Sequence, residues 1–132
     1  MNFRISSAAF FPVFFFLLAS QAVSQHISAY HRIARITVDK SRLNEYLDAL
    51  HSQMSAALKN EKGVLEYIAV QEKDNPEKII IFETYASPEA YQLHIQTEHF
   101  KKYKATVADM VLELELTDVV PVARRSKKMS VN

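Results

Sequence analysis

The sequence predicts an α+β domain of the ferredoxin-like type, with the order β-α-β-β-α-β and a four-stranded antiparallel sheet. Two observations predict this fold: four segments rich in β-branched or alternating apolar residues, and, between them, two segments whose apolar residues recur at helical spacing. A third is the turn chemistry that separates the middle two strands. With 132 residues, the chain is long enough for one such domain and not for two.

The first predicted strand covers Tyr30–Val38, and Asp39 or Ser41 can cap the helix that follows. From Leu43 onward the apolar residues have a period of 3.6, which predicts a helix with one buried stripe. Gly63 stands just past the end of that pattern, where a helix commonly needs a left-handed residue. The apolar positions of the stripe are 43, 46, 47, 50, 54, 57 and 58.

The middle of the chain predicts a hairpin of strands Val64–Gln71 and Lys78–Tyr85. Between them lies the turn sequence Asp74–Glu77. Four consecutive apolar residues, Ile79–Phe82, open the second of these strands, so we expect it to be covered on both faces.

A second helical region starts at Ser87, which can cap a helix over 88–95 with a proline at its first position. The helical pattern restarts at Thr97 or Glu98 and continues to Met110. The last predicted strand covers 111–122 and ends near its proline, which cannot donate a ladder hydrogen bond.

The predicted helices cover one face of the sheet and leave an apolar face bare. Large exposed apolar faces mark interaction sites. We therefore expect a homodimer in which two sheets pack face to face.

Composition excludes several classes of protein. Cysteine is absent, so there is no disulfide framework and no thiolate metal site. The net charge of +1 gives no indication of nucleic-acid binding. The single glycine excludes a glycine-rich phosphate loop.

Residues 1–24 have the layout of a secretory signal peptide. Arg4 precedes an apolar run from Ala8 to Ala19 that is short for a membrane span, and small residues follow it. We expect cleavage after Ser24, with Ser20 and Ala22 as alternatives, and an uncleaved N-terminal anchor as the competing interpretation. The expected mature chain is an exported protein, periplasmic or secreted and bacterial, without a stable membrane anchor. Its domain covers 25–122, and a basic, disordered tail covers 123–132.

The segments E-K-G-V-L-E-Y, I-F-E-T-Y and A-Y-Q-L-H-I-Q-T-E-H-F, in this order, resemble the antibiotic biosynthesis monooxygenase domain of the dimeric α+β barrel superfamily. The resemblance covers roughly Arg32 to Leu116. It implies a homodimer with a small cavity between sheet and helices in each subunit. The family includes cofactor-independent oxygenases of quinols or polyketide-like phenols, haem-degrading proteins and an isomerase of a phosphorylated sugar. The haem-degrading pattern uses a tryptophan, and this chain has none.

The resemblance places the acid that ends the third strand at Glu83 and the histidine of the following helix at His94. A histidine can remove a proton from a phenol or quinol near neutral pH, and a nearby carboxylate can orient its ring. We therefore interpret His94 as the catalytic base and Glu83 as its partner. The competing interpretation is a structural hydrogen bond between these two residues.

Aromatic side chains can line a cavity that accepts an aromatic substrate, although each can equally belong to the core or a dimer interface. Besides Phe82, which shares this pattern, the predicted substrate-binding residues are Tyr67, Tyr85, Tyr91, His99 and Phe100.

His94 and His99 are five residues apart, and a break near Gln96 could bring them together with a glutamate as a metal set. Such spacing lacks the specificity of a metal motif, so we expect no metal and no other cofactor. The predicted function is cofactor-independent oxidation of a small quinol or phenol by O2. The alternatives are a non-catalytic small-molecule-binding or stress-related dimer, and an isomerase of a small carbonyl compound.

Overall fold

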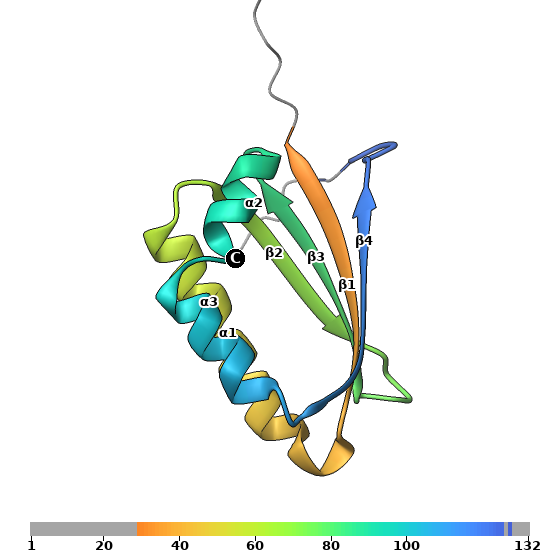
Figure 1. Cartoon of the computed structure of the whole chain (residues 1–132). Coiled ribbons are helices and arrows are strands. Elements are labelled where there is room, and N and C mark those ends of the chain that lie inside the picture. The colour runs from red at the N-terminus through yellow and green to blue at the C-terminus, as the bar shows by residue number, and fades with distance from the viewer. Residues whose placement is uncertain (1–28, 126, 128–132) are drawn as a thin grey trace, which may run out of the picture.

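A four-stranded antiparallel sheet with helices on one face forms the domain, as the computed structural model shows (Figure 1). The structure describes residues 29–125 and 127. The strand order is β2-β3-β1-β4, with β3 and β1 in the centre of the sheet. The predicted ferredoxin-like fold is confirmed. The elements are β1 (Tyr30–Val38), the 3-10 turn η1 (Lys40–Arg42), α1 (Leu43–Asn60), β2 (Val64–Gln71), β3 (Lys78–Tyr85), α2 (Pro88–His94), α3 (Glu98–Val107) and β4 (Val111–Val119).

The first three strands have the predicted bounds, whereas two later elements are shorter than predicted. Helix α3 ends at Val107 instead of Met110, and β4 ends at Val119, two residues before Pro121. That proline follows the strand, as its missing N–H requires.

Side-chain caps fix where the helical segments begin. Asp39 accepts a hydrogen bond from the backbone N–H of Ser41 at 2.8 Å and so starts η1, which leads directly into α1. Ser87 caps α2 and Thr97 caps α3 in the same manner. Because Thr97 caps α3, α2 and α3 are two separate helices and not one continuous helix. This break determines how His94 and His99 are placed relative to each other.

The predicted role of Gly63 is wrong, because no described residue of the chain has a positive φ. A Cβ atom at position 63 would lie 2.6 Å from the Cβ atom of Ala90, which is closer than side chains can approach. Glycine is required there because helix α2 packs against this backbone, and its conformational freedom is not used.

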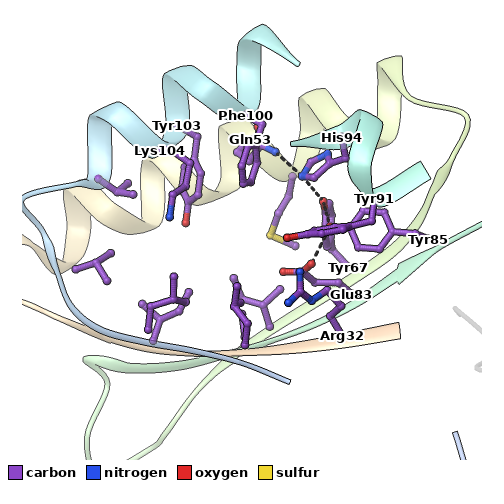
Figure 2. Close-up of a pocket in the computed structure, with 18 residues that line it drawn as sticks. Arg32, Gln53, Tyr67, Glu83, Tyr85, Tyr91, His94, Phe100, Tyr103 and Lys104 are labelled. Carbon is purple, nitrogen blue, oxygen red and sulfur yellow. Dashed lines mark hydrogen bonds between the residues drawn. The ribbon is translucent and has the colours of Figure 1, made fainter. Parts of the chain in front are cut away.

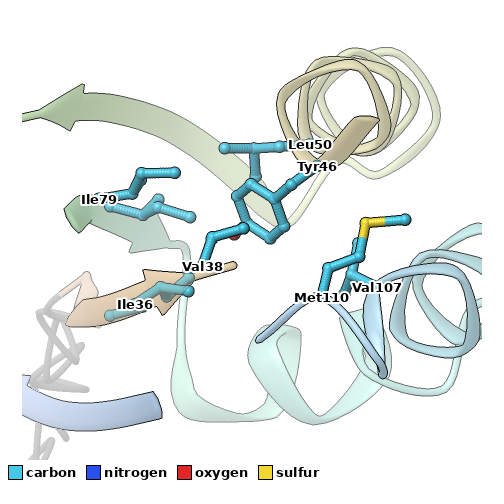
Figure 3. Close-up of a cluster of buried hydrophobic side chains, with 9 residues drawn as sticks. Ile36, Val38, Tyr46, Leu50, Ile79, Val107 and Met110 are labelled. Atoms are coloured by element: carbon cyan, nitrogen blue, oxygen red, sulfur yellow. The ribbon is translucent and has the colours of Figure 1, made fainter. Parts of the chain in front are cut away.

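The predicted stripe of α1 packs on the sheet with one exception. Leu58 is 47% exposed and lies off the buried face, which instead includes Gln53. At one end of the layer between helices and sheet, aliphatic residues and one tyrosine form a dense cluster (Figure 3). We call this the packed end. Its buried members are Ala34, Ile36, Val38, Tyr46, Leu50, Ile79, Ile81, Val107 and Met110.

The apolar run of β3 faces both ways. Ile79 and Ile81 are buried beneath the helices, whereas Ile80 and Phe82 lie on the opposite face and are partly exposed. On the neighbouring strand β2, Ile68 is 49% and Val70 is 53% exposed. Ile68 and Val70 pair with Phe82 and Ile80 in the sheet register, so these residues form one apolar outer face. That face is the one predicted to be covered by a second copy.

The predicted signal peptide lies outside the described residues, as does most of the predicted tail. Within the described part, no helix is both long enough and apolar enough to span a membrane. Arg124, from the start of the predicted tail, forms an ion pair with Glu66 of β2 at 3.1 Å.

Candidate functional site

A cavity of about 90 Å³ lies between the helices and the sheet, beyond the packed end (Figure 2). Its wall is mainly apolar and aromatic, with side chains from the sheet on one side and from α1, α2 and α3 on the other. The charged side chains in the wall come from Arg32, Glu83 and Lys104, and His94 joins them from the helical layer. Two leucines of β4, Leu114 and Leu116, line the cavity although each is 45% exposed, so this side of it opens towards solvent.

His94 is the last residue of α2 and is 1% exposed. Both of its ring nitrogens have partners. Nε2 lies 3.1 Å from the hydroxyl of Tyr67 and 3.4 Å from the amide nitrogen of Gln53. Nδ1 lies 2.9 Å from Oε1 of Glu61, the residue that follows helix α1. The ring is therefore held between the Glu61 carboxylate on one side and Tyr67 and Gln53 of the cavity wall on the other. Figure 2 shows the side of the ring that faces the cavity.

These contacts assign the tautomer of His94. An ionised carboxylate can only accept hydrogen bonds, so Nδ1 carries the ring proton and donates it to Glu61. In the neutral ring, the lone pair of Nε2 accepts from the amide nitrogen of Gln53, which can only donate, and contacts the hydroxyl of Tyr67. Burial lowers the pKa of His94, and the hydrogen bond to Glu61 opposes this effect. The arrangement makes His94 a neutral base whose accepting nitrogen is on the cavity side.

Glu83 projects from β3 into the same cavity. Its Oε2 accepts a hydrogen bond of 2.7 Å from the hydroxyl of Tyr85. Burial raises the pKa of Glu83, and both the Tyr85 hydrogen bond and the charge of Arg32 oppose that rise. Arg32 itself stacks over the ring of Tyr91 at 4.4 Å and lies 3.0 Å from Asp118.

The structure joins Glu83 to His94 through two tyrosines. The hydroxyls of Tyr67 and Tyr85 are 3.1 Å apart, and each also contacts one of the two candidate residues. In the part of the chain that the structure describes, no direct hydrogen bond connects Glu83 with His94; the carboxylate bonded to the histidine is that of Glu61. The expected direct partnership needs this correction because Glu83 belongs to the sheet and His94 to the helical layer, and the tyrosine rings fill the space between them.

Four of the predicted substrate-binding residues line the cavity: Tyr67, Tyr85, Tyr91 and Phe100. The fifth, His99, is on the other side of His94. Its Nε2 lies 2.6 Å from Oε1 of Glu61, and its ring borders a surface groove between α1 and α3. Phe82 is on the outer face of the sheet, beside the ring of His31, and so does not line the cavity.

Sequence reasoning missed two residues of the site, Glu61 and Gln53. Gln53 is 6% exposed, lines the cavity, and its Oε1 has no hydrogen-bond partner among the described residues. A signal for it existed, because it lies between Leu50 and Ala57 on the apolar stripe of α1. Glu61 opens the E-K-G-V-L-E-Y segment that carries the family resemblance, but its place in a charged stretch after the helix gives no local sign of a contact with His94.

Glu61, His94 and His99 are also the residues that could hold a metal ion. Each offers one ligand atom, and these atoms lie within 4.8 Å of one another. The sequence suggested that a break near Gln96 could bring the two histidines together, and the structure has that break between α2 and α3.

Comparison with known proteins identifies relatives over most of the domain. Residues 29–106 match the family described as antibiotic biosynthesis monooxygenase. A solved structure from Bacteroides thetaiotaomicron, named after the same family, is 41% identical, covers 77% of this chain and 97% of its own, and has a TM-score of 0.73. No curated protein matches the chain.

Two more distant solved structures share the fold. A protein of Lactobacillus acidophilus is 24% identical over 71% of this chain and 45% of its own, with a TM-score of 0.70. A protein of Nitrosomonas europaea is 20% identical over 71% of this chain and 90% of its own, with a TM-score of 0.67.

Proposed function

Because this chain belongs to the antibiotic biosynthesis monooxygenase family, we propose that it oxidises a small quinol or phenol with O2, without a cofactor, and that His94 is the base. The observation that carries this proposal is the orientation of His94. Its Nδ1 is bonded to Glu61, which leaves Nε2 as an acceptor beside an apolar, aromatic-lined cavity. This is the geometry that a general base for a phenolic proton requires.

The size of the cavity limits the substrate. A volume of about 90 Å³ is smaller than the roughly 150 Å³ of an engineered cavity that binds benzene. Even one aromatic ring would therefore extend into the opening of the cavity or require its wall to move, and a polycyclic substrate is disfavoured further. Substituents on that ring would extend past Leu114 and Leu116, where the cavity opens.

The reaction balances without an external electron donor. His94 takes the proton of the hydroxyl, and the phenolate that forms is electron-rich enough to react with O2. For a phenol with a free para position, one oxygen atom enters the ring, the other leaves as water, and the product is a quinone. The substrate supplies all four electrons, which is why neither a flavin nor a metal is needed for the balance.

Polar groups in the wall can orient the ring. Oε1 of Gln53 is a buried acceptor without a partner, so a substrate hydroxyl that donates to it would remove an unsatisfied group. Glu83, with its raised pKa, can accept from a second hydroxyl or donate to a ring oxygen. We assign it this orienting role, in which it acts on the substrate and reaches His94 only through Tyr85 and Tyr67.

The cavity favours the oxygenase over an isomerase and over a purely structural dimer. An isomerase of a polar carbonyl compound needs several ionisable groups around its substrate. The wall provides Arg32, Glu83, Lys104 and His94, but the rest of it is mainly apolar and aromatic, which suits an aromatic ring better than a polar compound. A purely structural dimer has no need of a hollow interior. A non-catalytic binding protein would have the same cavity, so activity has to distinguish it.

We further propose that the protein is a homodimer that acts outside the cytoplasm. The outer sheet face with Ile68, Val70, Ile80 and Phe82 is apolar, and a second copy packed on it would cover all four. Light scattering should give twice the mass of the mature chain, and Val70→Glu should give the monomer mass; a wild-type monomer would contradict the dimer. Export is tested by fractionating cells and sequencing the mature N-terminus.

Oxygen uptake by the mature protein with a panel of single-ring quinols and phenols tests the function. We expect uptake above the spontaneous rate, and a decrease of roughly 10²- to 10⁴-fold in His94→Ala, the usual contribution of a general base. His51→Ala is the matched control, because His51 is an exposed histidine of α1. Equal rates in wild type and His94→Ala across the panel would refute the proposal and favour the binding protein.

A further inference from the structure

We propose that Glu61, His94 and His99 form a binding site for a divalent transition-metal ion such as Zn²⁺, and that the bound ion inhibits the protein. The metal site is independent of the proposed oxidation. The inhibition rests on the proposed function, because it concerns the base that the function needs.

The three ligands come from three separate elements that meet at one point. Glu61 follows the last residue of α1, His94 ends α2, and His99 is in the first turn of α3. On one continuous helix, histidines five residues apart would point about 140° away from each other. Thr97 prevents this by capping α3, and its hydroxyl donates to the backbone oxygen of His94 at 2.7 Å. The break therefore turns both rings towards the same carboxylate.

The distances fit a site that exchanges protons for an ion. Oε1 of Glu61 lies 2.9 Å from Nδ1 of His94 and 2.6 Å from Nε2 of His99. Zn²⁺ binds imidazole nitrogen and carboxylate oxygen at about 2.0–2.2 Å, which places neighbouring ligand atoms of a tetrahedral site roughly 3.3 Å apart. The two distances from the carboxylate oxygen would have to increase by about 0.4 and 0.7 Å to admit the ion, and all three ligand atoms already lie within 4.8 Å of one another. Two histidines and one carboxylate also match the ligand preferences of Co²⁺ and Ni²⁺.

An ion can reach the site from the protein surface, and the three side chains leave one coordination position of the ion to water. The side chains of Glu61 and His99 are 13% and 24% exposed, and His99 borders the surface groove between α1 and α3. An ion can therefore reach His99 from this groove. Three protein ligands leave the fourth position of a tetrahedral ion for water, as in open zinc sites. On the far side of the ring, Tyr67 and Gln53 hold Nε2 and so fix the orientation of His94.

Metal binding would reverse the role of His94. A neutral imidazole carries one proton, so coordination through Nδ1 leaves that proton on Nε2. Nε2 would then donate towards Tyr67 and could no longer accept a proton from a substrate. The same residue can thus bind the ion or act as the base, but not both at once.

Calorimetric titration of tag-free mature protein with Zn²⁺ tests the site. We expect one ion per chain at this site, and affinity at least about 100-fold weaker in Glu61→Gln and His99→Gln, beyond what second-shell changes usually cost. His51→Gln should bind as wild type does. No binding by the wild type, or equal affinity in all four proteins, would overturn the proposal.

A rescue variant guards against misfolding. His99→Cys keeps a zinc ligand at the same position, so it should bind Zn²⁺ and should give the visible absorption of tetrahedral Co²⁺, which His99→Gln should lack. Wild-type affinity in both His99 variants would mean that His99 is not a ligand. If the wild type binds Zn²⁺ but consumes no oxygen, the metal site stands and the proposed oxidation fails. If it oxidises quinols and Zn²⁺ does not inhibit it, the switch is refuted.

Discussion

The two ends of the layer between helices and sheet are built from different side chains. At the packed end, Ile36, Val38, Leu50 and Ile79 fill the space around Tyr46 (Figure 3). At the other end, which we call the cavity end, tyrosines, His94 and Glu83 surround a hollow (Figure 2). Strands β1 and β3 and helices α1 and α3 contribute to both ends, whereas α2 contributes only to the cavity end. The difference therefore arises from the side chains of the shared elements and from the presence of α2.

This difference separates stability from reactivity. Aliphatic side chains at the packed end stabilise the fold by leaving water and filling space. The groups at the cavity end are ionisable and desolvated, which raises the pKa of Glu83 and lowers that of His94. Buried ionisable groups destabilise the fold unless they are paired, and groups with shifted pKa values are typical of functional sites. Substitutions at the packed end should consequently lower stability and leave activity nearly unchanged. Substitutions of the ionisable groups at the cavity end should lower activity with little loss of stability.

The largest effect on stability is expected from Leu50→Ala at the packed end. Leu50 is 3% exposed, and its removal leaves a cavity among well-packed neighbours. The free energy of unfolding should decrease by about 3 kcal/mol, while oxygen uptake per folded molecule should stay within a factor of two or so. Urea denaturation measures the first quantity. A loss below about 1 kcal/mol would mean that this end is not the tighter one.

Gly63→Ala should have the next largest effect. The added Cβ atom would meet that of Ala90 at 2.6 Å, so α2 must move and His94 moves with it. We expect a decrease of about 1–3 kcal/mol in the free energy of unfolding and slower oxidation. The double variant Gly63→Ala with Ala90→Gly removes the clash and should recover most of both. Failure of this rescue would exclude close packing as the reason for glycine.

Glu83→Gln should increase the free energy of unfolding near neutral pH, whereas the two preceding substitutions decrease it. Since the folded-state pKa of Glu83 is raised above its unfolded value, the stability it contributes is complete at acidic pH and is lost as pH rises through the folded pKa. At pH 7.5 the variant should thus be more stable than wild type by on the order of 1 kcal/mol, although less active. The gain should vanish below pH 4. A variant that is less stable at every pH would show that the ionised carboxylate stabilises the fold.

A smaller effect is expected in the acid dependence of stability. The pKa of His94 is lowered in the folded state, so its contribution is present above the unfolded value of about 6.5 and is lost as pH falls through the folded pKa. Wild type should lose stability in that interval, and His94→Gln should lose less. Melting temperatures between pH 7 and 5 measure both slopes, and His51→Gln serves as the control. Identical slopes in wild type and His94→Gln would contradict a buried neutral histidine.

The sequence was sufficient to predict the fold and most of the aromatic wall of the cavity. It was not sufficient to predict Glu61, the carboxylate that is hydrogen-bonded to His94. Hydrophobic periodicity and caps are local signals, so the strands, the Ser87 cap and the restart of the helix at Thr97 or Glu98 could be predicted. The contact between Glu61 and His94 joins residues 33 positions apart, and no local pattern encodes it. Gly63 shows the same limit, because its reason is a neighbour that only the folded chain brings close.

The orientation of strand β3 could be predicted only in part. Four consecutive apolar residues indicate cover on both faces but do not say which residue faces which layer. The structure places Ile81 beneath the helices and Ile80 on the outer face. A charge at Ile81 would hence report on the core, whereas a charge at Ile80 or Val70 would report on the proposed dimer.

The protonation state of His94 is the most direct test of the account. Imidazole nitrogen NMR of the metal-free mature protein, assigned with His94→Gln, measures which ring nitrogen carries the proton between pH 5 and 8. The account predicts a neutral ring at pH 7 with the proton on Nδ1, and protonation only below the usual histidine range. A ring that is charged at pH 7, or that carries its proton on Nε2, would contradict the assignment of His94 as the base facing the cavity.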